Sequence, residues 1–289
     1  MEYLYLLLAI CASATLSIMS SLFGKRNASI TNATPLYSLI VVSSACLSFG
    51  LICLIDTDFD IRTLGYSALY GIFYSVAMIG MFLAYRCGPT SLTAFIKQLS
   101  LICVALWGFL FWGNRLSLTV GAGLVLIVIA LALCFAKKRQ QGEAVVSLKW
   151  LLYAAMLLCG NAGCSIVQKY QQMAFDERTK NSFMLFGMLM ALAFCLVLYL
   201  SKERCRLSTL AKGSVVFPIL GGVSSAALNL LILLLMGSSL EESIIFPGIA
   251  VGGLTLTLLF SVVAYRERLT ARQWIGLGCG TVALVFLNL

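Results

Sequence analysis

Ten apolar runs, each about as long as a membrane-spanning helix, occupy most of this 289-residue sequence. They lie near residues 3–24, 36–55, 65–86, 90–112, 118–136, 149–169, 182–200, 213–236, 243–264 and 272–289. Hydrophobic residues make up 61% of the chain and charged residues only 11%, which is too little charge to cover a soluble globule. This pattern excludes a secreted, cytosolic or nucleic-acid-binding protein.

These runs predict helices rather than strands. Backbone polar groups must be paired inside a bilayer, and the runs are too long for the strands of a barrel. The longest connection, residues 137–147, has no room for a soluble domain. The predicted fold class is an all-α integral membrane protein with ten transmembrane helices.

Basic residues are distributed unevenly between the two sets of connections. Of the 20 Lys and Arg residues, 14 fall on one face and four on the other. Because the face rich in basic residues is usually cytoplasmic, this count places both chain termini outside the cell membrane.

A weak internal repeat relates the two halves at an offset of 153 residues. Residues 111–116 (FWGNRL) align with residues 264–269 (AYRERL), and Gly123 aligns with Gly276. With five spans in each half, the second half must insert upside down, which is typical of secondary transporters. We therefore expect two inverted five-helix repeats, residues 1–140 and 141–289.

The duplicated turn resembles that of a known family. Residues 113–116 (GNRL) and 266–269 (RERL), with Lys25 and Lys169 at the ends of the first span of each half, are similar to the EamA type of the drug/metabolite transporter superfamily. The resemblance implies a ten-helix metabolite carrier that works by alternating access, often an exporter.

The sequence departs from this pattern in two ways. Many members are drawn with both termini in the cytosol, opposite to the charge count, so both orientations stay open. The positions eight residues before the two lysines, where related small multidrug resistance proteins carry a carboxylate, hold Ser17 and Asn161. Neither side chain carries a proton, which argues against direct proton coupling through a carboxylate.

Several chemistries are excluded or disfavoured by composition. The chain has no His, its 11 Cys residues show no zinc-ligand spacing, and no P-loop motif is present. We therefore expect no catalytic residues, no metal, no cofactor and no ATP-driven transport.

Lys97 is the clearest ionisable group inside a span, and such groups are functional candidates by default. Thr93, Lys97 and Ser100 share one helix face by their spacing. Several interpretations remain open for Lys97. It stays cationic and pairs with a substrate carboxylate or phosphate, it is neutral, or it snorkels to the interface. A structural bond with carbonyls or a Tyr hydroxyl is a further alternative to a substrate or coupling role.

Other polar residues lie deep in apolar runs. Tyr70 and Tyr74 are four residues apart, and Asn161 and Asn229 lie in the sixth and eighth runs. Each is predicted either to line a substrate site or to hold neighbouring helices together.

The ninth run contains Pro247, Gly248, Gly252 and Gly253. Pro and clustered Gly weaken a helix, so this segment is a candidate hinge or gate, with simple close packing as the alternative.

The leading functional hypothesis is a secondary transporter of a small polar or anionic metabolite in the cell membrane. Its expected partners are the small-molecule substrate and the lipid bilayer, without nucleic acid, and the protein is expected to be a monomer or homodimer. The alternatives are a non-transporting assembly or sensor protein and an intramembrane enzyme that acts on lipid-linked substrates.

Overall fold

The computed structural model describes residues 2–27, 30, 33–55, 60–87, 90–113, 117–135, 148–175, 179–201, 210–265 and 271–287. The helices in these ranges are α1 (Glu2–Arg26), α2 (Ala33–Ile55), α3 (Thr63–Cys87), α4 (Thr90–Phe111), α5 (Leu118–Phe135), α6 (Leu148–Phe175), α7 (Lys180–Ser201), α8 (Val216–Met236), α9 (Glu242–Tyr265) and α10 (Ala271–Leu287). No strand occurs in the described ranges, so the all-helical prediction is confirmed for them.

Among the described residues, six helices are long and apolar enough to cross a membrane: α1, α2, α3, α6, α7 and α8. Shorter apolar stretches lie in α4 (Ile96–Phe111), α5 (Leu118–Ala130) and α9 (Ser243–Thr257). These lengths are consistent with a membrane protein. That all ten helices cross the bilayer, and that they form inverted repeats, remain predictions.

The largest difference from the predicted spans is at α6. The sequence analysis ended this span near Lys169, whereas the helix continues to Phe175. The added turn contains Gln171 and Gln172, which lie beyond the lysine at which the predicted span ended. Both side chains are instead buried, and an amide hydrogen bond joins them, so the helix continues.

The described chain divides into two compact units. Unit 1 contains residues 3–75 and 167–238, and unit 2 contains residues 76–166 and 239–289, with Glu2. Each unit therefore combines helices from both sequence halves. Because compact packing does not test duplication, the predicted repeats at 1–140 and 141–289 remain predictions.

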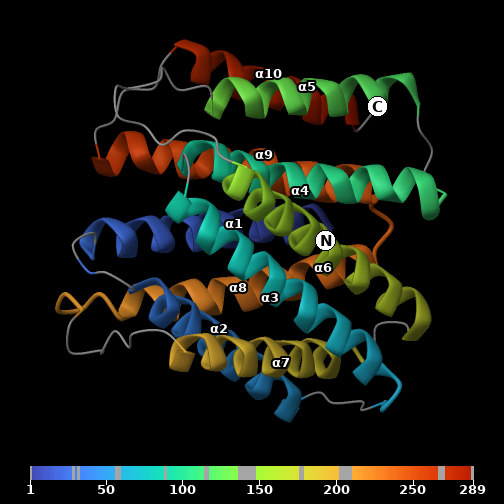
Figure 1. Ribbon diagram of the computed structural model, residues 1–289. Helices are drawn as coiled ribbons and strands as arrows, with labels where there is room; N and C mark the ends of the chain where they lie inside the picture. The colour runs from blue at the N-terminus through green and yellow to red at the C-terminus, as the bar shows by residue number, and fades with distance from the viewer. Residues whose placement is uncertain are drawn as a thin grey trace. The chain divides into compact units, whose positions relative to one another are not determined.

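In unit 1, α2 packs against both α7 and α8 (Figure 1). Helices α3 and α7 also approach closely, at Gly71 and Gly187. A Cβ at Gly71 would lie 2.6 Å from the Met190 Cβ, and one at Gly187 would lie 2.6 Å from a ring carbon of Tyr70. Small residues at such crossings let membrane helices approach backbone to backbone.

Asn27 connects the end of α1 to the start of α8 in unit 1. It is buried, its Nδ2 donates to the Phe23 carbonyl, and its Oδ1 accepts from the Ala211 N–H at 3.1 Å. The Ser214 hydroxyl lies 3.5 Å from the same oxygen. This side chain therefore links the last turn of α1 to the segment that precedes α8.

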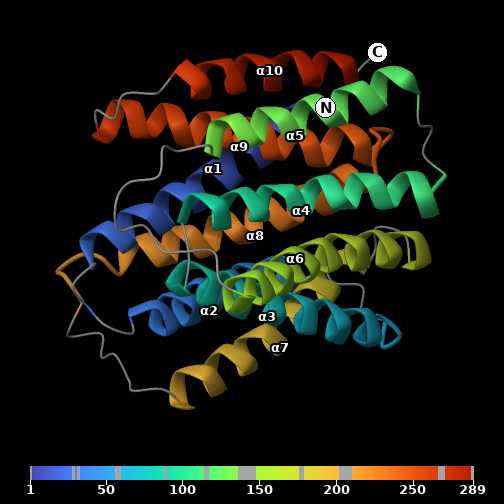
Figure 2. The same cartoon turned by 45° about the horizontal axis from the view of Figure 1, so that its top comes forward.

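In unit 2, α5 and α10 lie side by side, and α9 contacts both α4 and α5 (Figure 2). Their shared apolar cluster comprises Ile102, Ala105, Val120, Leu124, Ile127, Val251, Leu254 and Ala283. The same unit contains a very close crossing of α3 and α6. A Cβ at Gly80 would lie 2.5 Å from the Leu157 nitrogen and 2.8 Å from the Tyr153 carbonyl oxygen.

Candidate functional site

Unit 1 contains a hydrogen-bonded polar network that includes two of the predicted site residues. The Tyr70 hydroxyl on α3 donates to Asn229 Oδ1 on α8 at 3.1 Å. Gln168 Nε2 on α6 donates to the same oxygen at 3.0 Å. One amide oxygen therefore joins three helices within the apolar interior.

The neighbours of this network fix its geometry. Asn229 Nδ2 donates to the Ser225 carbonyl at 2.8 Å, and this bond orients the amide. The Tyr70 side chain has no exposed area, and its ring stacks on Tyr74 at 5.9 Å and meets Phe183 edge-on at 5.4 Å. Tyr70 and Asn229 are thus held in place before any ligand arrives.

The Gln168 side chain is bonded to its neighbours through its amide nitrogen. Its side chain is 1% exposed, and its Nε2 donates to Asn229 Oδ1 and, at 3.6 Å, to the Met184 sulfur. Within the described ranges, Gln168 Oε1 accepts no hydrogen bond.

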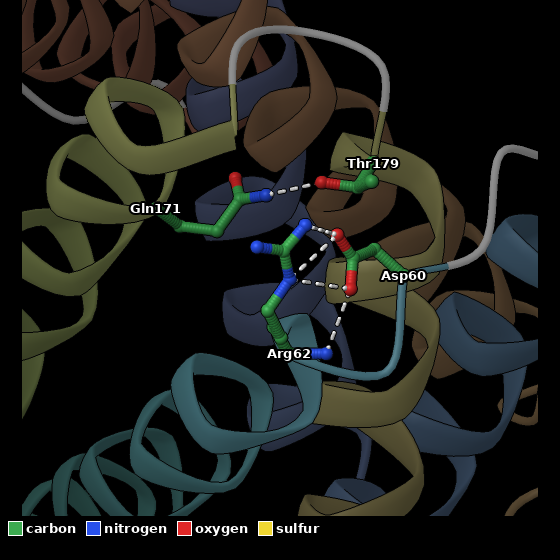
Figure 3. A network of polar contacts seen from close by, with 4 residues as sticks. All are labelled: Asp60, Arg62, Gln171 and Thr179. Carbon is green, nitrogen blue, oxygen red and sulfur yellow. Dashed lines mark hydrogen bonds and ion pairs between the residues drawn. The ribbon is translucent and has the colours of Figure 1, made fainter.

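Gln168, Gln171 and Gln172 follow the i, i+3, i+4 spacing and form what we call the amide face of α6. Gln171 Nε2 donates to Thr179 Oγ1 at 2.9 Å, as Figure 3 shows, and Gln171 Oε1 accepts from Gln172 Nε2 at 2.6 Å. Gln172 Oε1 is buried, and no group of the described chain donates to it. Within the described ranges, the amide face thus has one buried acceptor oxygen without a donor, Gln172 Oε1.

An exposed ion pair lies beside Gln171 and Thr179 (Figure 3). Arg62 Nη2 lies 2.8 Å from Asp60 Oδ2, and the Arg62 backbone N–H donates to Asp60 Oδ1 at 2.9 Å. The guanidinium also covers the Phe175 ring at 5.7 Å. These contacts connect the start of α3 to the end of α6 outside the apolar part of both helices.

The charge of Asp60 depends on Arg62. The side-chain hydrogen bonds from Arg62, followed by its backbone N–H, hold the pKa of the Asp60 carboxyl below its ordinary value. Because the pKa is lowered in the folded state, the pair contributes fully to the stability of the fold at pH values above the ordinary Asp pKa of about 4. The contribution disappears as the pH falls through the lower, folded-state pKa.

We expect Asp60→Asn to change the unfolding midpoint at neutral pH by no more than about 2 °C, because exposed ion pairs contribute little. The difference from the wild type should shrink as the pH falls below about 4 and vanish only below the lowered folded-state pKa, where the wild-type carboxyl also loses its charge. Thermal unfolding in detergent at both pH values measures this. A fall of the midpoint by many degrees would contradict the exposed placement of the pair.

Unit 2 contains a second polar group, built around Lys97 on α4. Lys97 is half-buried, and within the described ranges its ammonium has no hydrogen-bond or ion-pair partner. The neighbouring Ile96 packs on the cluster of Ala84, Trp150 and Ala154, so the helix around Lys97 is apolar. Burying an unpaired ammonium in apolar surroundings is costly. An anionic ligand bound to Lys97 would compensate the charge, so this position favours such a ligand.

Ser100 and Asn161, both predicted site residues, meet in this unit. Asn161 Nδ2 on α6 donates to Ser100 Oγ on α4 at 2.7 Å, and that hydroxyl donates to the Lys97 carbonyl at 2.6 Å. Ser100 is fully buried and Asn161 is half-buried. Asn161 therefore fixes the turn of α4 that carries Lys97.

The predicted site residues therefore fall in two places within the fold. Tyr70, Tyr74 and Asn229 belong to unit 1, and Lys97, Ser100 and Asn161 belong to unit 2. Thr93 lies in α4, but its side chain is outside the described part of the chain, as are residues 114–116 and 266–269 of the duplicated turn.

The predicted hinge lies within an uninterrupted helix. Pro247, Gly248, Gly252 and Gly253 are all in α9, which runs from Glu242 to Tyr265. Because Pro247 has no N–H, the Ser243 carbonyl lacks its usual helical donor. Pro247, Gly248 and Gly253 are buried, and Gly252 is half-buried. Whether this segment bends stays a prediction.

Lys169 has a structural contact. Its ammonium donates to the Met236 carbonyl at 3.0 Å, at the last residue of α8. A cation there pairs with the unsatisfied carbonyls and the negative end of the helix dipole. The side chain of its counterpart, Lys25, is outside the described part of the chain.

The sequence analysis did not identify Gln168, Gln171 or Gln172 as site residues. Two signals were present: the helical spacing of three amides and their position directly after an apolar run. Lys169 was interpreted as the end of the span, which placed Gln171 and Gln172 outside it, and Gln168 lay beside that end.

The comparisons with known proteins concern the fold alone. No family model and no curated protein matches the chain. The chain is similar to a solved structure described as "Crystal structure of protein", with a TM-score of 0.74 and 13% sequence identity. The alignment covers 99% of this chain and 95% of the chain in that structure. This similarity shows a shared fold and indicates no activity.

Proposed function

We propose that the protein is a secondary membrane transporter for a small polar or anionic metabolite. The observation that carries this proposal is the ammonium of Lys97, which lies half-buried in an apolar helix without a partner in the described ranges. A charge in this position is costly in a membrane protein unless it binds something, and an anionic substrate supplies the missing charge.

The polar network in unit 1 supports the same proposal. Tyr70, Gln168 and Asn229 place hydrogen-bonding groups inside helices that are long and apolar enough to span a membrane. Transporters bind polar substrates near the middle of the bilayer through such groups.

The finer parts of the proposal come from the sequence. We propose ten spans in two inverted repeats, alternating access as the mechanism, and membership of the EamA type of the drug/metabolite transporter superfamily. The duplicated turn and the 153-residue offset support these points. Location in the cell membrane belongs to the same proposal, and we propose no catalytic role.

A flux assay tests the transport proposal. The full chain is reconstituted into proteoliposomes. Counterflow is then measured with labelled carboxylates and organic phosphates that contain three to six carbon atoms. We expect saturable flux of one anion class, and we expect the same anions to raise the unfolding midpoint in detergent, because ligands stabilise the state they bind.

The control is protein-free liposomes prepared in parallel. Flux equal to that of the empty liposomes for every anion would overturn the transport proposal and favour an assembly or sensor role. Chemical conversion of a lipid-linked substrate without flux would favour an intramembrane enzyme.

A further inference from the structure

Two exposed basic residues, Arg26 and Lys212, meet at one end of unit 1. Arg26 is the last residue of α1, and Lys212 lies in the segment that precedes α8. The residues next to them in the chain, Asn27 and Ala211, are joined by the hydrogen bond from the Ala211 N–H to Asn27 Oδ1 at 3.1 Å. This bond therefore holds the backbones of the two basic residues close together.

Arg26 also has a fixed support. Its guanidinium carbon lies 5.6 Å from the centre of the Phe217 ring on α8, a distance at which a cation is attracted to an aromatic face. Phe217 in turn packs against the apolar cluster that includes Phe23 and Leu210. The cationic end of unit 1 is thus built on packed side chains of α1 and α8.

The two connections that meet at this bond are strongly basic along their whole length. Residues 24–34 and 201–215 contain six basic residues and one acidic residue, Glu203. The basic residues are Lys25, Arg26, Lys202, Arg204, Arg206 and Lys212. Clusters of four to eight Lys and Arg residues directly beside a membrane-spanning helix are typical of binding to anionic lipids.

An exposed apolar face begins on α8 just after Lys212. Val216, Ile219, Leu220 and Val223 are each 43–52% exposed, and their spacing places them on one side of the helix. Helix α8 is long and apolar enough to cross a membrane. Cations followed by an apolar face match the two parts of a phospholipid, a charged headgroup and an acyl chain.

We propose that Arg26 and Lys212 bind the headgroup of an anionic phospholipid whose acyl chain lies along the exposed face of α8. This inference goes beyond the proposed transport function, because it concerns the surrounding bilayer and not the transported solute. The distribution of basic residues predicts that this end of the unit is cytoplasmic, on the side where anionic lipids gather. A lipid fits better than a free anion because the apolar face continues from the cations.

The test compares two phospholipids that have the same acyl chains and differ in headgroup charge. Phosphatidylglycerol and phosphatidylcholine are each titrated into the full chain in a neutral detergent, and the unfolding midpoint is measured. We expect phosphatidylglycerol to raise the midpoint at lower concentrations than phosphatidylcholine, because a ligand stabilises the state it binds. The difference should shrink as salt is added, because salt screens exposed charges.

The double variant Arg26→Gln/Lys212→Gln removes both cations. We expect its apparent affinity for phosphatidylglycerol to fall roughly 25-fold, about fivefold for each cation, with the response to phosphatidylcholine unchanged. The single variant Lys212→Gln keeps the contact between Arg26 and Phe217. It should lose about fivefold in affinity and unfold at the wild-type temperature in the absence of lipid, because the Lys212 side chain is exposed.

The matched control is Lys149→Gln/Arg272→Gln, which removes the same charge from two exposed residues near the starts of α6 and α10. It should bind phosphatidylglycerol as the wild type does. An equal loss of affinity in the control would show attraction by net charge alone and overturn the proposed site. Equal responses of the wild type to the two lipids would overturn it as well. An equal rise of the midpoint with glycerophosphoglycerol, the headgroup without acyl chains, would rule out a lipid as the occupant.

Discussion

Replacement of Lys97 by alanine is expected to lower transport of the anionic substrate by at least about 30-fold. The estimate follows from the 2–5 kcal/mol typically lost when one partner of a buried, hydrogen-bonded charge pair is removed. Lys97→Arg should keep part of the binding, because the positive charge remains while its shape and donor geometry change. Initial rates in proteoliposomes measure both effects.

The stability of a third variant separates a binding role from a structural one. Lys97→Met removes the charge and keeps a long side chain, so its unfolding midpoint without substrate should stay the same or rise. If Lys97 instead held α4 in place through hydrogen bonds to carbonyl groups, its substitution would lower the unfolding midpoint.

The matched control is Lys149→Ala, which changes an exposed lysine at the start of α6 in the same unit. It should transport at the wild-type rate. Unchanged transport in Lys97→Ala would remove Lys97 from the mechanism and favour snorkelling, without disproving a carrier.

Gly80→Ala is expected to lower the unfolding midpoint by about 10 °C, through overpacking that costs about 3 kcal/mol. The added methyl group would overlap the α6 backbone at Leu157 N and Tyr153 O, and backbone atoms cannot turn aside as a flexible side chain can. The larger Gly80→Leu change should prevent recovery of a monodisperse protein. Thermal unfolding and size-exclusion chromatography in detergent measure these outcomes.

Gly65 offers a control in the same helix, because nothing lies within 4 Å of a Cβ built there. Gly65→Ala should leave the midpoint within about 2 °C of the wild type, since a helix interior tolerates alanine well. Equal unfolding midpoints for Gly80→Ala and Gly65→Ala would contradict the close crossing of α3 and α6.

The sequence predicted the helices well because each depends on a local property. Runs of apolar residues mark a helix directly, and the four-residue spacing of Tyr70 and Tyr74 predicts that they share a face. Their rings do stack in the structure. Such patterns do not identify a hydrogen-bond partner on another helix. The spacing of residues within one helix does not predict that Tyr70 bonds to Asn229, or Asn161 to Ser100.

The amide face shows the opposite case, in which a local rule misleads. Polarity at Gln171 and Gln172 predicts exposure, yet Thr179 and the neighbouring amide supply the hydrogen bonds that make burial tolerable. Those bonds depend on how α7 begins after the connection, which no periodicity within α6 describes. The last turn of α6 was missed for this reason.

The interleaved composition of unit 1 has a consequence for biogenesis. Residues 3–75 leave the ribosome well before residues 167–238, the segment against which α2 packs through α7 and α8. In the proposed membrane protein, the early helices therefore insert before their partners are synthesised. Lipid then contacts the surfaces that α7 and α8 later cover. Quality-control factors that recognise unassembled helices have this interval in which to act, and substitutions that weaken the later contacts prolong it.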